Sequence, residues 1–289
     1  YTFMAPWNAI ILLGGIPVPV DVEIDTMNID PSKIEKKISK KTKAIIVVHL
    51  YGCPANITKI LKLKKKYNLY LIEDCAEAIG SYYKKKHLGL FGDIGTFSFY
   101  GNKTISTGEG GMVIFKKKKY FTKAKLIKNH GMSDKKRYFH SYFGSNFRMT
   151  NIQAAIGLAQ LEKFNTIIQK KNKLNKTYIS AFKNCKSITF IKTKKNQINS
   201  YWLFNILINT DSKIRRDKVI TLLRQDGIDV RRGFFSASEQ PLFKKYFKKK
   251  ETFPVSNYLS KNIISLPSFP HLPKKIVENI TQRVKKILL

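Results

Sequence analysis

The sequence predicts an α/β protein, with a mainly parallel sheet flanked by helices and a smaller α/β domain after it. Short apolar runs alternate with helical segments through the first half, as strands and helices do around a parallel sheet. Residues 44–50 (AIIVVHL) are apolar almost without interruption, which is typical of a parallel strand buried on both faces. We place a large domain at residues 1–165 and a small one at 166–289, divided near the end of a strong helix.

The elements of the first half follow from apolar periodicity and from capping residues. Gly14 and Gly15 close a first short helix, and Asp30 and Asn56 are suited to cap two later helices. Asp74 directly follows a strand, as does the segment after Tyr100, and ligands of parallel sheets bind at such carboxyl ends. The expected helices are 8–13, 31–39 and 57–66, and the expected strands are 17–22, 44–50, 69–73, 95–100 and 111–115.

The second half is expected to hold fewer strands. Residues 150–164 (TNIQAAIGLAQLEKF) predict a strong helix that continues into another at 166–182. A strand at 201–208 and helices at 215–225 and 274–288 then complete the small domain.

The charge of the chain is strongly positive, +35 over 289 residues. Taken alone, this points to nucleic acid or to an acidic surface. Only eight of the 54 basic residues are arginine, and the lysines spread along the chain in short runs, whereas nucleic-acid sites cluster their charge and favour arginine. An A- and T-rich genome explains the composition as well, so we expect no specific nucleic-acid partner, only weak binding to polyanions.

The cysteines and the apolar runs bear on the compartment. Cys53, Cys75 and Cys185 show no metal-site spacing, and their odd number closes no disulfide framework, which favours a reducing compartment, the cytoplasm. No apolar run is long enough to span a bilayer, so no membrane partner is expected. Because the chain starts at Tyr1 and leads straight into a helix-like run, we expect an N-terminal part to be missing.

The most informative stretch is 92–111, GDIGTFSFYGNKTISTGEGG, in which a strand delivers Ser98, a turn delivers Lys103, and a glycine-rich loop follows. Pyridoxal phosphate needs a lysine with a free amine, a carboxylate at its pyridine nitrogen and hydrogen-bond donors for its phosphate. Lys103, Asp74 and Ser98 are candidates for these three tasks, and all three lie at expected strand ends.

Two other interpretations of Lys103 remain at this stage. In a chain with so many lysines, one lysine after a strand can simply be a solvated turn residue. Gly101-Asn102-Lys103-Thr104 also ends like a nucleotide-binding P-loop, but that motif requires glycine directly before the lysine, where Asn102 stands.

Several motifs in register resemble the DegT/DnrJ/EryC1/StrS family of sugar aminotransferases, and most closely its perosamine synthase-like members. That family has the fold of type I pyridoxal-phosphate enzymes, the aspartate aminotransferase architecture, which is what the resemblance implies here. The matching stretches are YTF (1–3), KAIIVVHLYGCPANI (43–57), LIEDCAEAIGS (71–81), GDIGTFSFYGNKTISTGEGGMV (92–113), KNHGM (128–132) and GSNFRMTNIQAAIGLAQLEK (144–163).

The resemblance assigns roles to four residues around the cofactor. The family lysine that forms the Schiff base corresponds to Lys103, and the aspartate at the pyridine nitrogen corresponds to Asp74. Glu77 takes the place beside the ring and its 3-oxygen, and Ser98 takes the place of the serine that binds phosphate. A surface position at a helix start is the alternative for Glu77.

Two further assignments concern the ring face and the partner subunit. Phe3 corresponds to the aromatic residue that stacks on the ring, and a plain core position is its alternative. Asn146 corresponds to the asparagine that reaches the cofactor phosphate of the neighbouring subunit, which implies a homodimer with shared sites; a turn or cap is the alternative. His130 is a candidate for the substrate pocket, whereas His49 is interpreted as structural.

The activity that the resemblance implies is a two-stage transamination. An amino-acid donor, with glutamate expected, gives its amino group to the cofactor, and a nucleotide-linked 4-keto-6-deoxy sugar receives it. The first candidate is the conversion of GDP-4-keto-6-deoxymannose to GDP-perosamine, in polysaccharide biosynthesis such as that of O-antigen.

Two departures from the family leave alternatives open. The family has about fifty residues before the position of Tyr1, including a helix start that binds the cofactor phosphate, and residues 231–241 contain Ser236-Ala237-Ser238 where relatives have a Pro-Leu-His-like stretch. The alternative function is a truncated, non-catalytic member with a binding or regulatory role. A dehydratase of the same family would have the lysine replaced.

Overall fold

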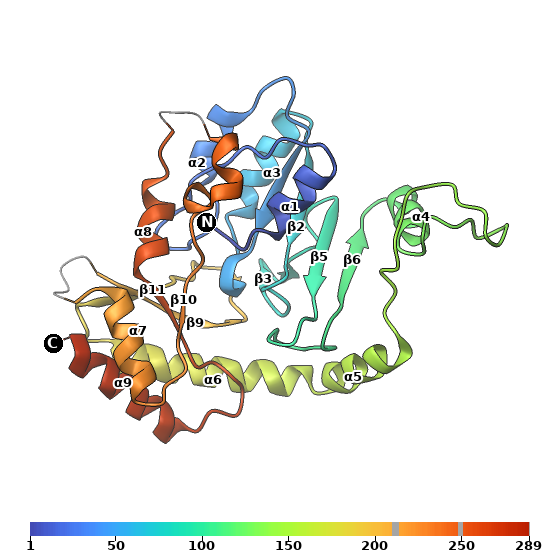
Figure 1. The fold of residues 1–289 in the computed structure, drawn as a ribbon. Coiled ribbons are helices and arrows are strands. Elements are labelled where there is room, and N and C mark those ends of the chain that lie inside the picture. Colours follow the sequence, from blue (N-terminus) through green and yellow to red (C-terminus); the bar gives the residue numbers. More distant parts are fainter. Residues whose placement is uncertain (210–213, 248–250, 289) are drawn as a thin grey trace.

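The computed structural model describes residues 1–209, 214–247 and 251–288. Its central sheet has four strands in the order β1-β2-β5-β6 (Figure 1). The first three are parallel, and the last pairs antiparallel with β5, which confirms the predicted α/β class with a mainly parallel sheet. The four strands are β1 (Ala44–Val48), β2 (Tyr70–Asp74), β5 (Ile94–Ser98) and β6 (Gly111–Phe115).

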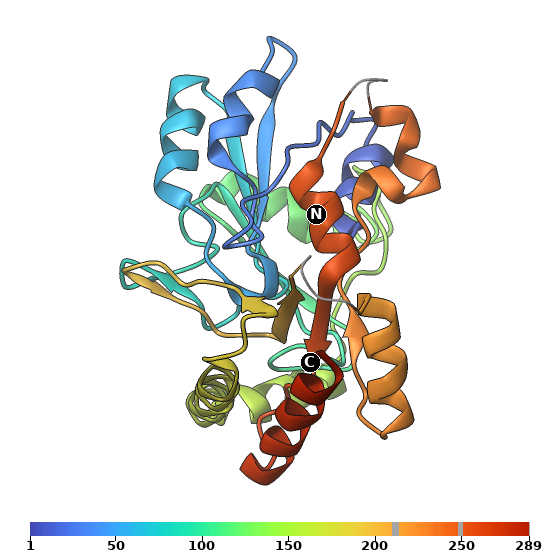
Figure 2. The same ribbon diagram turned by 90° about the vertical axis from the view of Figure 1, so that its left-hand side faces the viewer.

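Two helices before and between these strands begin where the capping residues predict, whereas α1 starts at Ala5 instead of the expected residue 8. The Asp30 side chain accepts a hydrogen bond from the Ser32 N–H at 2.9 Å, and Asn56 accepts one from the Lys59 N–H at 3.3 Å. One apolar cluster joins these helices to the sheet, and Figure 2 shows α2 and α3 side by side along it. The helices are α1 (Ala5–Leu12), α2 (Pro31–Ile34), which continues as a 3-10 turn at Glu35–Lys37, and α3 (Ile57–Lys66).

The strand predicted at 17–22 is wrong. The only pairing in this segment is an isolated bridge between Val22 and Ile29. Pro17 and Pro19 lack an N–H group, so alternate residues of the segment donate nothing to a ladder. A cavity also separates the segment from β1, the edge strand that its apolar alternation would fit.

The second half forms an antiparallel sheet, ordered β10-β11-β9-β7, with α6, α7 and α9 in the same apolar cluster. A third, small sheet, ordered β4-β3-β8, joins the two halves of the chain. Helix α8 and strand β11 were not predicted. The strands are β3 (Tyr82–Tyr83), β4 (Lys86–His87), β7 (Ile188–Phe190), β8 (Gln197–Ile198), β9 (Phe204–Ile208), β10 (Arg231–Arg232) and β11 (Ile263–Leu266), and the helices are α6 (Phe164–Phe182), α7 (Arg216–Gln225), α8 (Pro254–Asn262) and α9 (Lys274–Leu288).

An arm, defined as residues 118–162 with α4 (Lys118–Ile127) and α5 (Asn151–Glu162), extends from the sheet. Figure 1 shows α4 and the chain after it projecting away from the rest of the molecule, and α5 running in line with α6. Neither α4 nor α5 buries a residue. Thr150 and Gln153 form a capping box at the start of α5, so local hydrogen bonds define where this helix begins.

Apolar clusters bear on the division into domains. One cluster lies wholly in residues 174–288 and two lie in residues 20–114, but a fourth combines Val22, Met27 and Tyr51 with Leu207 and Ile263. The boundary at residue 165, where α6 has just begun, stays a prediction. No helix in the described part of the chain is long and apolar enough to cross a membrane.

Candidate functional site

Asp74 and Lys103 lie at the carboxyl-terminal edge of the parallel strands. Asp74 is the last residue of β2, so its side chain emerges where that strand ends, and it pairs in register with Thr96, near the end of β5. Its carboxylate accepts a hydrogen bond from the Ala76 N–H at 3.0 Å. Burial raises the pKa of Asp74, and the nearby charge of Lys103 acts in the opposite direction.

Glu77 is the second carboxyl group that faces Lys103. It is 4% exposed and accepts a hydrogen bond from the Tyr51 N–H at 2.6 Å. Tyr51 has a φ of +53°, an uncommon conformation for a bulky residue, which turns its N–H toward the carboxylate. Burial raises the pKa of Glu77 to about 7, against the opposing effects of Lys103 and of the Tyr51 hydrogen bond.

Lys103 follows β5 in a tight turn, in which its N–H donates to the Tyr100 carbonyl at 2.9 Å. Burial lowers the pKa of its amine, while the charges of Glu77 and Asp74 act to raise it. The charges of two carboxyl groups thus act on this amine, in surroundings that lower its pKa. Partial desolvation of this kind is what a lysine that attacks a carbonyl requires.

Helix α5 holds the glycine-rich loop that follows Lys103. The Gln160 amide accepts from the Ser106 N–H at 3.0 Å and donates to the Ser106 carbonyl at 2.6 Å. Gln153 donates to the Glu109 carbonyl at 3.0 Å, and a Cβ at Gly157 would lie 2.7 Å from Thr107. A polar, small-residue stripe of α5 therefore fixes the loop, a function that the motif alone did not reveal.

Trp202, from the second half of the chain, completes the surroundings of the amine. The Nζ of Lys103 lies 3.8 Å from the centroid of its indole ring. The Trp202 Nε1–H donates to the carbonyl of Asn102 at 2.7 Å. Sequence reasoning missed this residue, because it lies about a hundred positions from Lys103 and belongs to no motif that was recognised.

Glu73 and His49 form a buried hydrogen-bond network next to the strand ends. His49 accepts from the Ala55 N–H through Nδ1 at 3.1 Å, so its Nε2–H donates to Glu73, also at 3.1 Å. Glu73 accepts three further hydrogen bonds, from the N–H groups of Gly89, Phe91 and Gly92, at 2.9, 2.7 and 2.6 Å. Buried His49 is thus structural, as interpreted from the sequence.

His49, Glu73 and Cys75 lie close enough to share a metal ion, with ligand atoms within 4.8 Å of one another. Both ring nitrogens of His49 and both oxygens of Glu73 are already engaged in hydrogen bonds. Because those bonds occupy the lone pairs that a cation would need, we interpret the cluster as structural.

The other predicted residues lie at different distances from this centre. Ser98 ends β5 and is half-buried, and its hydroxyl accepts from the Tyr100 N–H at 3.3 Å. Phe3 is 62% exposed and packs on Phe234, with ring centroids 6.1 Å apart. Asn146 is exposed on the arm, where it bridges to Asn129, so the structure does not bring it to Lys103 of its own chain. His130 also lies on the arm and is exposed.

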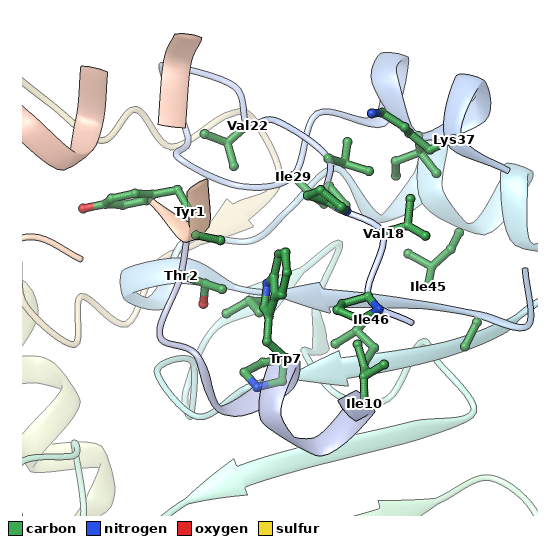
Figure 3. A pocket seen from close by; sticks show the side chains of 18 of the residues that line it. Tyr1, Thr2, Trp7, Ile10, Val18, Val22, Ile29, Lys37, Ile45 and Ile46 are labelled. Carbon is green, nitrogen blue, oxygen red and sulfur yellow. The ribbon is translucent and has the colours of Figure 1, made fainter. Parts of the chain in front are cut away.

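A large, mostly apolar cavity lies elsewhere in the described part of the chain. It has a volume of about 660 Å³ and is bounded by α1, by residues 14–22 and by β1. Figure 3 shows Trp7, Val18, Ile29 and Ile46 around this space, with Tyr1 and Thr2 at one end. Lys103, Asp74 and Glu77 do not line it, so the cavity is separate from the polar centre.

The polar centre fits pyridoxal phosphate by the chemistry of its groups. It offers a desolvated amine, a strand-end carboxylate for a pyridine nitrogen and a second carboxyl group beside it. The Thr104 hydroxyl, next to the lysine, is buried without a hydrogen-bond partner. An unsatisfied buried donor at this position suits an anionic or polar ligand group.

Comparison with known proteins agrees with this chemistry. The model of the DegT/DnrJ/EryC1/StrS aminotransferase family matches residues 1–285. Two similar relatives are GDP-perosamine synthases, from Escherichia coli O157:H7 (41% identity over 286 residues, 99% of this chain and 76% of the relative) and from Vibrio cholerae (38% over 285 residues, 99% and 77%).

Among solved structures, a Helicobacter pylori aminotransferase involved in the biosynthesis of pseudoaminic acid superposes with a TM-score of 0.93 at 30% identity, covering 99% of this chain and 77% of that one. The fold and the two comparisons point to the same family, and the chemistry of the polar centre suits its cofactor. The chain therefore belongs to the DegT/DnrJ/EryC1/StrS aminotransferase family and is a pyridoxal-phosphate-dependent sugar aminotransferase.

Proposed function

We propose that this enzyme moves an amino group from glutamate to C4 of a nucleotide-linked 4-keto-6-deoxy sugar, with GDP-4-keto-6-deoxymannose as substrate and GDP-perosamine as product. The observation that carries the proposal is the convergence of the Lys103 amine with the carboxyl groups of Asp74 and Glu77 at the ends of β2 and β5. The choice of sugar rests on the GDP-perosamine synthases at 38% and 41% identity.

Lys103 is the group that binds the cofactor and moves protons. The cofactor, when bound, supplies an aldehyde that exchanges with amino groups and a ring that withdraws electrons. The Lys103 Nζ takes a proton from the carbon of the donor that carries the amino group, and in the second half of the reaction it returns a proton to C4 of the sugar. Its lowered pKa keeps a share of the amine free for these transfers.

Asp74 and Glu77 have different roles toward the cofactor ring. Asp74 would hold the pyridine nitrogen in its protonated form, and that positive charge would offset the cost of burying the carboxylate. Glu77, whose pKa is about 7, would exchange a proton near neutral pH beside the 3-oxygen of the ring. Ser98 would donate to the phosphate, and Phe3 would stack on the ring.

We further propose a homodimer in which Asn146 reaches the phosphate bound by the partner subunit. Asn146 lies on the arm and is exposed. Helix α5 (NIQAAIGLAQLE) is largely apolar yet buries no residue, and Leu158 is 59% exposed on it. A second copy of the chain would cover this surface, as large exposed apolar patches require.

We place the enzyme in the cytoplasm. Cys53, Cys75 and Cys185 are all free thiols. Free cysteines in a folded protein are typical of a reducing compartment, and the nucleotide-sugar substrate and the amino-acid donor are the partners expected there.

The decisive experiment combines absorbance with product analysis. The purified protein with pyridoxal phosphate should show a near-visible band, and glutamate should bleach it. Added GDP-4-keto-6-deoxymannose should restore the band and yield an aminated GDP-sugar, detected by mass spectrometry.

Lys103→Ala should abolish both the band and the product, because it is the only described lysine whose charge acts on both carboxyl groups. The matched control is Lys59→Ala, which removes an exposed lysine of α3 and should keep both. A band that persists in Lys103→Ala would remove that residue from its role. Bleaching by glutamate without amination of this sugar would keep the transaminase and refute the proposed substrate.

A further inference from the structure

Lys103 does not form an ion pair with any carboxylate of the described residues. Its Nζ lies 3.8 Å from the centroid of the Trp202 ring, whereas the other lysine–ring contacts in the described part of the chain are 4.9 to 5.7 Å long. Glu77 and Asp74 act on Lys103 only through their charge, and no described carboxylate forms an ion pair with it. The indole face is therefore the group in direct contact with the ammonium.

The indole is held in place on several sides. Its Nε1–H donates to the carbonyl of Asn102, the residue before Lys103, at 2.7 Å. The Trp202 carbonyl accepts from the Nζ of Lys171 at 3.1 Å. Lys171 is itself 3% exposed and also donates to the Ser268 carbonyl at 3.2 Å. This buried lysine forms no ion pair with a described residue and binds these two backbone carbonyls instead.

The ring is also part of a stack. Trp202 and Tyr51 are nearly parallel, at 14° with centroids 6.2 Å apart, and Phe234 lies on Tyr51 at 5° and 5.5 Å. Tyr51 in turn donates its N–H to Glu77. Trp202 is 7% exposed and hydrogen-bonded at its Nε1 and its carbonyl, which fixes the ring beside Lys103.

We propose that the face of Trp202 is the resting site of the Lys103 ammonium whenever this amine is not bonded to the cofactor, so that Trp202 is a positioning residue for amino transfer. The inference rests on the proposed role of Lys103 and adds a residue from the second half of the chain. A lysine released in each half-reaction needs a partner that leaves Asp74 and Glu77 to the cofactor. An aromatic face attracts a cation strongly when the pair is desolvated, and tryptophan does so best.

The first test uses the cofactor-free enzyme and needs no activity. In a Trp7→Phe background, Trp202 is the sole tryptophan, since the chain has two. Lys103→Met should shift its emission maximum, because the ammonium leaves the ring face. Lys59→Met, on the exposed side of α3, is the matched control and should cause no shift. An unchanged emission in Lys103→Met would overturn the proposal.

The second test separates the ring face from the indole hydrogen bond. Trp202→Phe keeps an aromatic face but loses the bond to Asn102, whereas Trp202→Leu loses both. With the face as the cause, kcat should fall about tenfold in Trp202→Leu and much less in Trp202→Phe, with KM for the sugar unchanged in both. Equal losses in the two variants would assign the effect to the hydrogen bond and overturn the proposal.

Folding and cofactor chemistry are checked separately. Both Trp202 variants should retain the thermal unfolding midpoint of the parent within a few degrees, and the emission test needs no substitution of Trp202 at all. An emission shift in Lys103→Met together with no near-visible band in the parent protein would refute the proposed function. A band without an emission shift would refute only the resting site.

Discussion

The strand ends around Glu73 and the arm at residues 118–162 differ in how much of their chemistry is completed within one chain. Glu73 is fully buried, and its two oxygens accept four hydrogen bonds from the loop at 89–92 and from His49. The arm carries sequence motifs that are just as recognisable, yet α4 and α5 bury nothing. A motif therefore shows that a segment has a function, but only its burial shows whether the partner belongs to the same chain.

The largest effect is expected from breaking the strand-end network. In Glu73→Leu, the three N–H groups of the 89–92 loop and the ring of His49 lose their acceptor at a buried position. We expect the free energy of unfolding to fall by about 4 kcal/mol, measured by urea denaturation. Asp229→Asn, at a side chain that is 76% exposed, should change it by less than about 0.5 kcal/mol. Similar values for the two variants would contradict the network.

The pH dependence of the cofactor-free protein should reveal Glu77. Its pKa is about 7 in the folded state and 4.5 without the protein environment, so the folded chain holds the proton more tightly than the unfolded chain. This group's contribution is therefore fully present below pH 4.5 and is lost as the pH rises to 7, by about 3 kcal/mol.

Glu77→Gln should flatten that decline, in unfolding measured across pH 5 to 8. Asp93, whose pKa is lowered by its hydrogen bonds and by Lys64 against the opposing effect of burial, provides the opposite control, because its contribution is lost at low pH. An unchanged profile in Glu77→Gln would show that another group titrates in this window.

A smaller effect is expected where the arm contacts the site. Gln160→Leu removes both hydrogen bonds to Ser106, so the N–H and the carbonyl of Ser106 lose this partner. We expect a loss of about 1 to 2 kcal/mol in unfolding free energy, and weaker binding of pyridoxal phosphate in absorbance titrations. Gln160→Glu keeps the acceptor for the Ser106 N–H and should lose less. If the unfolding free energy falls as expected but cofactor binding is unchanged, the loop does not contribute to cofactor binding.

The sequence predicted local structure well wherever one segment determines it. Asp30 and Asn56 cap helices at the expected places, and 57–66, 111–115 and 274–288 have the expected bounds. Residues 17–22 failed because a strand depends on a neighbour that periodicity cannot supply. In the site, the convergence of Lys103, Asp74 and Glu77 followed from motif and strand ends, whereas Trp202 and Gln160 required the three-dimensional packing of distant segments.

The smallest effect on a single chain is expected on the exposed face of α5. Leu158 is 59% exposed and contributes to no apolar cluster of the described residues, so Leu158→Asp should change the stability of an isolated chain by less than about 0.5 kcal/mol. In a dimer that covers α5, the same carboxylate would be buried without a partner and would prevent association.

Sedimentation velocity should therefore show a dimer for the parent protein and a monomer for Leu158→Asp, with circular dichroism unchanged. Leu158→Gln, uncharged and of similar size, should weaken association less. A parent protein that sediments as a monomer, or a charged variant that stays dimeric, would mean that the arm is not completed by a second copy. Asn146 would then have no partner site to reach, and the comparison between the two regions would lose its explanation.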